Sequence, residues 1–290
     1  MGPWLGTDER PPEPEPAHQG SRRVPERRRA GEPCVSTTLL IDADIFAFAA
    51  ASANEGVYFF NGVENDPVVD ANLEDALVTA KRQIEDVANQ LKATRLIVCL
   101  TDEENFRYGV YPQYKGNRKD VRKPSTLRAV KDYLARNYET YKRPGLEADD
   151  CMGILSTHKT LITGKKIVVS SDKDLKTIPG LLHNPNQHKP GQVVEVSQWA
   201  ADRYFMEQTL TGDATDGYPG CKGIGAKSPY VTGLDACKDV KEMWELVKEG
   251  YAKKGFTAQD ALIQARCARI LRANDWDFAS KRVRLWNPPV

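Results

Sequence analysis

The sequence lacks the closely spaced cysteines and histidines that a zinc site or a disulfide framework needs. Its six cysteines are scattered, with no C-x-x-C pair, and its four histidines have no metal-ligand spacing. We therefore expect reduced thiols in a cytoplasmic protein. Any metal ion should be held by oxygen atoms rather than by nitrogen or sulfur.

Long apolar runs and a dominant charge are also missing. No stretch approaches the roughly 18 apolar residues of a membrane span, and no secretory segment follows Met1. The 290 residues carry a formal net charge of +1, so bulk charge does not indicate a nucleic-acid binder. Any basic surface must therefore be local, and we expect no membrane partner.

Short apolar strands alternate with amphipathic helices from Thr38 onward. We expect strands at 39–41, 96–100 and 167–169, and helices at 45–53, 71–91 and 147–159. Continuous apolar strands separated by helices are typical of an α/β fold, in which helices flank both faces of a mostly parallel sheet. After about residue 197 helical patterns dominate, with a glycine-rich turn at 217–225 between them.

Composition divides the chain into three parts. Residues 1–36 contain seven prolines, six arginines and six acids. Because such a segment buries little apolar surface, we expect a disordered tail, although Arg27-Arg28-Arg29 could contact DNA. Residues 37–196 form the predicted α/β core, and residues 197–290 form a predicted helical region.

Acidic residues follow each predicted strand. Because ligands bind outside the carboxyl ends of parallel strands, these acids should share one edge of the sheet. A single Asp after a strand is more often a helix N-cap, and Asp44 could cap the helix at 45–53. Two further groups lie at the start of the predicted helix 147–159 and beside the glycine-rich turn. The full set is Asp42, Asp44, Asp102, Glu147, Asp149, Asp150, Asp172, Asp174, Asp213 and Asp216.

So many carboxylates in one cleft would repel one another and raise one another's pKa values. A cation must compensate, and an all-oxygen ligand set favours Mg²⁺ or Mn²⁺. Two such ions can activate a water molecule and stabilise the leaving oxygen of a phosphodiester. The pattern therefore predicts a metal-dependent hydrolase.

A basic, aromatic segment lies between residues 103 and 143. It contains eleven Lys or Arg residues against five Asp or Glu residues, with four aromatic side chains among residues 106–114. Cations that neutralise phosphates and aromatics that stack on bases suit a single-stranded end. Pro124-Ser125-Thr126 should begin a helix that buries Leu127, Val130 and Leu134.

The glycine-rich turn can bind an anion. Gly223 and Gly225 would allow backbone N–H groups to approach a phosphate closely. Ser228 and Pro229 fit an N-cap and the first position of the next helix. A G-x-G pair alone is weak evidence, but it lies beside the acids of Asp213-x-x-Asp216.

The ordered motifs resemble the flap-endonuclease and 5′→3′ exonuclease family, which includes the 5′-nuclease domain of bacterial DNA polymerase I. The similarity is strongest to the gene 6 product type of exonuclease from short-tailed phages, and it covers about residues 38–286. The matching stretches are LIDADIFAF, LTDEENFR, YPQYKGNRK, LEADD, SSDKDLKTI, LTGDATDGYPGCKGIGAK and ARILR. The resemblance implies the PIN-like fold of this family, with a helical arch at 103–143 and a helix–hairpin–helix, in its three-turn-helix form, at 205–232.

The resemblance also implies residue roles. Lys115 and Arg118 would meet the scissile phosphate and the 5′ strand, and Tyr114 belongs to the same DNA-binding motif. Gly223, Gly225 and Lys227 would grip duplex DNA, with K⁺ at the glycine turn. The implied metal ligands for two ions are Asp42, Asp102, Glu147, Asp149, Asp150, Asp172, Asp174, Asp213 and Asp216.

The implied reaction is Mg²⁺- or Mn²⁺-dependent hydrolysis at 5′ ends and flaps of duplex DNA, and of RNA in RNA–DNA hybrids. It would serve phage-type replication or recombination in the host cytoplasm, with replication proteins as partners. One alternative is a flap endonuclease with little exonuclease activity, which would use the same residues. A second is a non-catalytic DNA-binding protein, and the intact set of acids argues against it. A third is a PIN-like ribonuclease, which lacks the glycine-rich helical hairpin.

Overall fold

The computed structural model describes residues 36–59, 68–118 and 121–289. The predicted tail at 1–36, with its three consecutive arginines, therefore lies almost wholly outside the described residues. The predicted core and helical region are both described, apart from two short gaps in the core.

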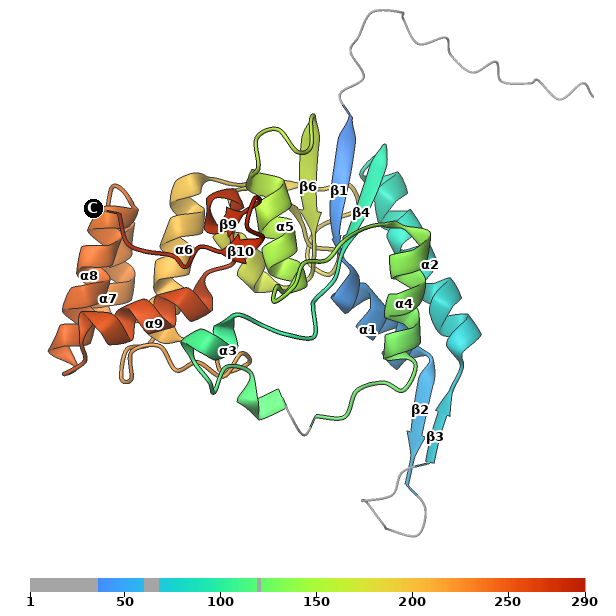
Figure 1. Cartoon of the computed structure of the whole chain (residues 1–290), viewed down its shortest axis with the longest axis horizontal. Coiled ribbons are helices and arrows are strands. Elements are labelled where there is room, and N and C mark those ends of the chain that lie inside the picture. Colours follow the sequence, from blue (N-terminus) through green and yellow to red (C-terminus); the bar gives the residue numbers. More distant parts are fainter. Residues whose placement is uncertain (1–35, 60–67, 119–120, 290) are drawn as a thin grey trace, which may run out of the picture. The chain divides into compact units, whose positions relative to one another are not determined.

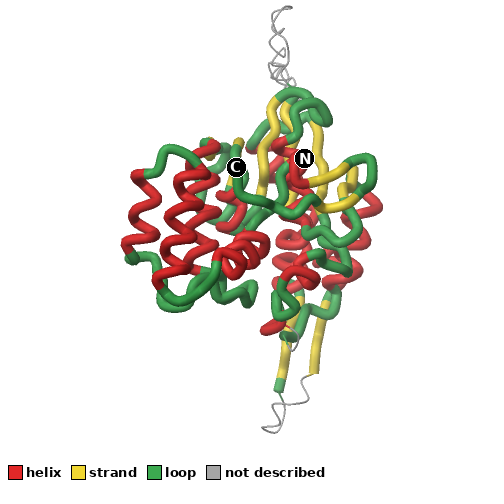
Figure 2. The backbone as a smooth tube through the Cα atoms, turned by 60° about the vertical axis from the view of Figure 1, so that its left-hand side comes forward, coloured by secondary structure: helices red, strands yellow, loops and turns green. Residues whose placement is uncertain are grey.

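Six strands form the main sheet, in the order β5-β4-β1-β6-β7-β8. All neighbouring pairs are parallel except β7 with β8, so the predicted mostly parallel sheet is confirmed. Figure 2 shows its strands running side by side among the helices. The strands are β1 (Thr37–Asp42), β4 (Arg95–Cys99), β5 (Glu139–Tyr141), β6 (Lys165–Val169), β7 (Gly180–His183) and β8 (Val194–Val196).

Helices connect and follow the strands (Figure 1). The α-helices are α1 (Ala43–Ala53), α2 (Leu73–Gln90), α3 (Arg107–Val110), α4 (Leu127–Asn137), α5 (Ala148–Thr157), α6 (Gln198–Thr211), α7 (Pro229–Thr232), α8 (Val240–Lys253) and α9 (Ala258–Ala268). Short 3₁₀ turns are η1 (Gly116–Arg118), η2 (Lys173–Thr177), η3 (Gly233–Ala236) and η4 (Ala273–Asp275). Two hairpins, which the sequence analysis did not anticipate, pair β2 (Glu55–Tyr58) with β3 (Val68–Ala71) and β9 (Trp276–Asp277) with β10 (Arg282–Val283).

Alternating side chains of the central strands enter two different cores. Leu39 and Ile41 pack with α1, α2 and α4 on one face of the sheet. Leu40, between them, packs with α5 and with Leu271 on the other face. Because both faces are covered, these strands read as continuous apolar runs. This arrangement leaves the carboxyl ends of β1, β4 and β6 available for polar side chains.

A third core joins the basic segment to the C-terminal helices. Phe205 of α6, Val247 of α8 and Ala265 of α9 are buried together with Tyr114 and Tyr218. The residues that precede and follow the glycine-rich turn are thereby packed against the segment that follows β4. The core thus brings the 103–143 segment and the acidic turn at 213–216 to the same place.

Local details agree with most of the expected helix boundaries. Val130 and Leu134 are buried on α4, as expected. Ser228 caps α7, and Pro229 is its first residue. One expectation is wrong: Asp42, not Asp44, accepts the capping hydrogen bond of α1, from the Ile45 N–H at 3.2 Å.

Membrane-spanning helices and disulfide bonds are both absent from the residues that the structure describes. No helix in that part of the chain is long and apolar enough to cross a membrane. The five cysteines that it includes are all free thiols, in agreement with the expectation of reduced cysteines.

Candidate active site

Three carboxylates form the centre of the site, at the carboxyl ends of β1 and β6 and the start of α5. Asp42 is the last residue of β1 and is only 2% exposed. Its Oδ2 accepts a hydrogen bond of 2.7 Å from the hydroxyl of Ser170, which follows β6. Asp172 follows the same strand, and Asp149 lies in the first turn of α5. In the described residues, none of these three acids forms an ion pair or a hydrogen bond with a basic side chain.

Burial and mutual repulsion raise the pKa values in this group. Burial, followed by the nearby charge of Asp44, raises the pKa of Asp42 to about 7. Burial and the charges of Asp42 and Asp172 raise the pKa of Asp149 well above its usual value. Burial and the charge of Asp172 raise the pKa of Asp174 to about 6. Carboxylates so close together without a cation are the arrangement that a metal ion would relieve.

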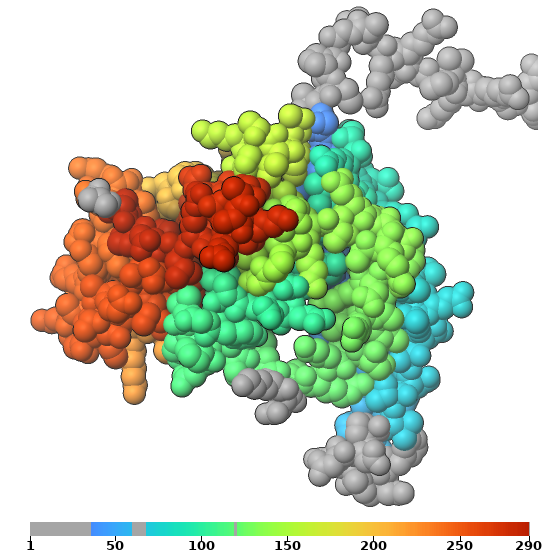
Figure 3. All heavy atoms as spheres, in the orientation of Figure 1, coloured from blue at the N-terminus to red at the C-terminus, as the bar shows by residue number. Residues whose placement is uncertain are grey.

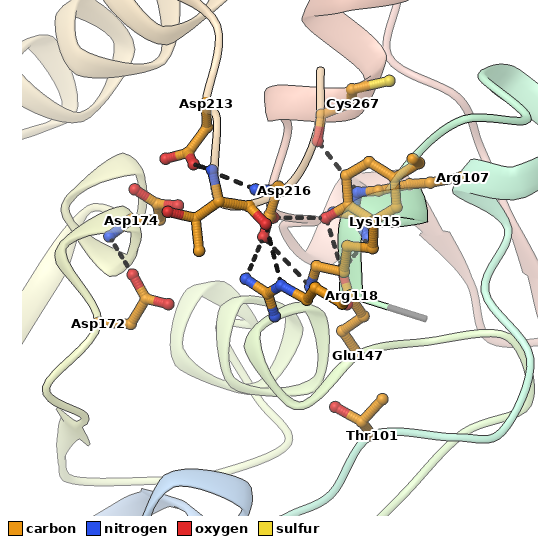
Figure 4. A network of polar contacts seen from close by, with 12 residues as sticks. Thr101, Arg107, Lys115, Arg118, Glu147, Asp172, Asp174, Asp213, Asp216 and Cys267 are labelled. Carbon is orange, nitrogen blue, oxygen red and sulfur yellow. Dashed lines mark hydrogen bonds and ion pairs between the residues drawn. The ribbon is translucent and has the colours of Figure 1, made fainter. Parts of the chain in front are cut away.

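A second group of acids adjoins the first. Asp213 and Asp216 lie in the turn after α6, which an isolated bridge between Asp213 and Tyr218 closes. The Lys173 ammonium contacts Asp213 Oδ2 at 2.6 Å and Asp174 Oδ1 at 3.4 Å. Figure 4 shows Asp172, Asp174 and Asp213 on one side of the network, with Asp216 near its centre. Asp174 therefore connects the two groups of acids.

Two basic residues of the predicted arch reach the same network. The Lys115 ammonium contacts Glu147 Oε1 and lies 3.6 Å from Asp216 Oδ1. The Arg118 guanidinium donates to Asp216 Oδ1 at 2.8 Å. Lys115 also has a left-handed backbone, with φ of +52°, and its N–H donates to the Asp216 carbonyl at 2.7 Å. This uncommon conformation ties the arch to the acidic turn at one residue.

Tyr114 is buried, and the expected stacking of its ring on DNA bases is wrong. Its side chain is 3% exposed and stacks on the Tyr218 ring, with centroids 6.3 Å apart. Its hydroxyl lies within hydrogen-bond distance of two carboxylates, 3.0 Å from Glu147 Oε2 and 2.7 Å from Asp216 Oδ2. Tyr114 therefore positions acids of the site and has no free face for a base.

Asp150 forms structural contacts with both of its oxygens, and its role as a metal ligand stays a prediction. It is fully buried, and the Arg107 guanidinium donates to both of its oxygens at 2.8 Å. The backbone N–H groups of Leu271 and Glu147 occupy the remaining acceptor positions, at 3.0 and 3.2 Å. In this arrangement all the lone pairs of Asp150 are engaged by protein groups.

Arg107 joins this pair to the C-terminal segment. Its guanidinium also donates to the carbonyls of Cys267 and Arg269, at 3.1 and 2.6 Å, and to Glu147 at 3.2 Å. Figure 3 shows the residues that follow α9 packed directly on the chain that follows β4. The orientation of Glu147 thus depends on residues far along the chain.

Two further acids lie at the rim with basic partners. Asp102 accepts from the Gly145 N–H at 2.9 Å and pairs with Lys142 at 3.1 Å, and these contacts lower its pKa. Asp44 pairs with Lys131 of α4 at 2.9 Å. Across the part of the chain that is described, no three acid, histidine or cysteine side chains are already arranged as a metal cage. The acids of the rim would have to exchange basic partners before they held an ion.

Gly223 and Gly225 of the glycine-rich turn are exposed, as phosphate-binding positions must be. Gly223 has φ of +85°, which favours glycine, and a Cβ at Gly225 would meet open space. Lys227 is exposed beside them. The helix after the turn, α7, has only four residues, so the second helix of the predicted helix–hairpin–helix is short.

Comparison with known proteins identifies the family. Residues 37–182 match the model of the 5′-3′ exonuclease N-terminal, resolvase-like domain. An exonuclease of Escherichia phage T7 is 30% identical over 86% of this chain and 93% of the phage protein. The chain belongs to the 5′-3′ exonuclease family. It is therefore a nuclease, and its relatives include exonucleases and flap endonucleases.

A second phage relative of this 5′-3′ exonuclease family member and a solved structure are also similar to the chain. The exodeoxyribonuclease of Enterobacteria phage T3 is 28% identical over 86% of this chain and 92% of its own. The flap endonuclease of bacteriophage T5, solved as a pseudo-enzyme-product complex with DNA and metal ions, has 15% identity and a TM-score of 0.56. That likeness covers 80% of this chain and 90% of the T5 chain, and it shows the shared fold.

The structure adds three residues to this exonuclease site that the sequence analysis missed. Arg107 is one of eleven basic residues in its segment, and nothing in the sequence distinguishes it as the buried one. Lys173 lies between two predicted ligands, and this position could have drawn attention to it. Gln208 donates to Asp174 at 2.6 Å, and its place on the inner face of α6 was the available signal.

Proposed function

We propose that this chain is a two-metal-ion 5′→3′ exonuclease and flap endonuclease that hydrolyses phosphodiesters in duplex DNA. The observation that supports it most directly is the group formed by Asp42, Asp149 and Asp172, at the ends of β1 and β6 and the start of α5, with no basic partner among the described residues. Family membership gives the class of reaction, and this group supports our proposal for where it occurs. A flap endonuclease with little exonuclease activity is the second candidate, because it would use the same residues.

The side chains of the site fit Mg²⁺ or Mn²⁺. Carboxylate oxygens without histidine or cysteine suit hard divalent ions, and the raised pKa values mark acids that lack a compensating charge. Asp42, Asp149 and Asp172 would hold one ion, and Asp174 would join Asp213 and Asp216 at the second. Glu147 and Asp102 would complete the site from its rim. Bound there, such ions supply an activated water and stabilise the leaving oxygen.

Lys115 and Arg118 would hold the reacting phosphate. In the structure both form ion pairs with acids of the same site, Lys115 with Glu147 and Arg118 with Asp216. Glu147 and Asp216 would hold an ion when one is present, and the two basic groups would then be free to pair with a phosphate beside them. Their positive charges would then stabilise negative charge that develops on the phosphate during hydrolysis.

The exposed turn at Gly223 and Gly225 would bind the duplex part of the substrate through its backbone N–H groups, with Lys227 as a phosphate contact and K⁺ at the turn. The T5 relative was solved with DNA and metal ions, which supports DNA as the partner. We further propose that RNA–DNA hybrids are accepted, and that the enzyme serves phage-type replication or recombination alongside replication proteins in the host cytoplasm.

A substrate panel tests this proposal. Purified protein would be given 5′-labelled blunt duplex, a 5′ flap and an RNA–DNA hybrid, each with Mg²⁺ and with EDTA. The proposal expects Mg²⁺-dependent cleavage of all three. Cleavage of the flap alone would favour the second candidate, and binding without any cleavage would contradict both.

A further inference from the structure

Lys173 lies among the acids of the site, although it belongs to none of the basic segments. It is the first residue of η2 and stands between Asp172 and Asp174 in the sequence. Its side chain is 57% exposed, yet its ammonium contacts carboxylates from two elements: Asp213 at 2.6 Å and Asp174 at 3.4 Å. An exposed lysine elsewhere would keep its ammonium in water, because a single surface ion pair gains little. Two acids hold this one in place.

The position of this ammonium is informative. Asp213 is nearly buried, and Asp174 is further fixed by the amide of Gln208. The ammonium therefore supplies the one positive charge that these two acids share in the described residues. A positive unit charge at this point reduces the repulsion between Asp213 and Asp174, as a metal ion between them would. A divalent ion and the ammonium cannot both take these oxygens, because each requires the same lone pairs.

We propose that Lys173 is a tethered cation that occupies the second-metal position and competes with the divalent ion for it. This inference rests on the proposed function, since it assigns the second ion to Asp213, Asp216 and Asp174. The ammonium holds Asp213 and Asp174 together in the absence of the ion and would move into solvent when the ion binds. Its largely exposed side chain makes that exit possible without any change in the core.

The competition sets the order and the strength of metal binding. The first group, Asp42, Asp149 and Asp172, has no basic partner to displace among the described residues, so it should take an ion at lower concentration. The second ion must displace Lys173, so it binds more weakly. Loss of the lysine therefore strengthens binding of the second ion and leaves the first unchanged.

Mn²⁺ binding to the whole chain without DNA tests this inference, with free Mn²⁺ followed by electron paramagnetic resonance. Lys173→Met should lower the Kd of the weaker site by at least about fivefold, because a competing unit charge a few ångströms away is removed. Lys173→Arg keeps the charge and should restore weak binding. Lys176→Met is the matched control, because Lys176 lies in the same turn and is exposed, and it should bind Mn²⁺ as the wild type does.

The melting temperature of the metal-free protein gives a second readout. Lys173→Met should melt at a lower temperature than Lys176→Met in EDTA, because Asp213 and Asp174 then repel each other without a cation. A weaker-site Kd in Lys173→Met that is unchanged or higher overturns the role of Lys173. No bound Mn²⁺ in the wild type or in any variant overturns the proposed metal site itself, and the inference with it.

Discussion

Arg107 and Asp150 form a buried bidentate ion pair, with both nitrogen–oxygen distances at 2.8 Å. The pair joins the start of α3 to the start of α5, and Leu271 adds a backbone N–H from the C-terminal segment. Asp149, the adjacent residue, has no basic partner in the part of the chain described here. Two neighbouring acids of one helix thus have opposite tasks: Asp150 holds the structure together, and Asp149 faces the site.

The two acids should therefore respond oppositely to the loss of their charge. Asp150→Asn leaves the buried Arg107 with Glu147, at 3.2 Å, as its remaining acidic partner, so the free energy of unfolding should fall by about 3 kcal/mol, as for other broken buried pairs. Asp149→Asn removes repulsion with Asp42 and Asp172, so it should leave the metal-free protein as stable or more stable. Chemical denaturation in EDTA measures both values. A larger loss of stability for Asp149→Asn would reverse the assignment.

Metal-free protein should lose stability as the pH rises. Asp42 and Asp174 have pKa values of about 7 and 6 in the folded state, above the 3.8 of an unperturbed Asp. The folded state therefore binds more protons than the unfolded chain, and the free energy of unfolding falls between about pH 4 and pH 7. In EDTA, the melting temperature should drop on the order of 5 °C from pH 5 to pH 8.

Two additions check the cause of this pH dependence. Mg²⁺ at pH 8 should restore the melting temperature, because the ion replaces the protons. Asp42→Asn should flatten the profile, because it removes the larger of the two shifts. A melting temperature in EDTA that stays level or increases from pH 5 to pH 8 would show that the pKa values of these acids are not raised in the folded state.

The arch residues should matter more for cleavage than for binding. Lys115→Ala or Arg118→Ala removes a charge that we place on the reacting phosphate, so single-turnover cleavage should fall by at least about tenfold. Affinity for the duplex part should change less, with a shallower salt dependence. Lys81→Ala on α2 is the control, because Lys81 forms only an exposed pair with Glu85. Rates within about twofold of wild type in all three variants would make the arch residues ordinary surface charges.

The two glycines of the exposed turn should separate folding from DNA binding. Gly223 has a left-handed backbone, so Gly223→Val should lower both stability and duplex affinity. Gly225 has open space around its Cα, so Gly225→Val should fold normally and lower only the affinity. Fluorescence anisotropy with duplex DNA, beside a thermal melt, distinguishes the two. Unchanged affinity in both variants would remove this turn from the DNA interface.

The sequence predicts the sheet and the place of the site because both follow from local patterns. Leu39, Leu40 and Ile41 form a continuous apolar run because both faces of β1 are covered. The acids at strand ends share an edge because parallel strands end together. Nothing in the local sequence indicates which of these acids forms an ion pair with a basic side chain. Asp150 differs from Asp149 only because Arg107 and the Leu271 N–H, both distant in sequence, meet it in the core.

The same limit applies to aromatic residues. Tyr114 lies in a basic, aromatic segment, and this pattern suits base stacking as well as it suits burial. Whether its ring is buried or exposed depends on Tyr218, about a hundred residues later in the sequence, which covers the ring. Periodicity describes a residue's own element, and it contains no information on which distant element will pack against it.

The direct test of the whole account is the metal requirement of cleavage from a defined end. Duplex DNA labelled at either the 5′ or the 3′ end would be incubated with metal-free protein in EDTA, and Mg²⁺ would then be added in excess. We predict no cleavage before Mg²⁺ and release of the 5′ label after it, with a rate at least about 10²-fold lower in Asp172→Asn. Full activity in EDTA, or release of the 3′ label first, would contradict the account.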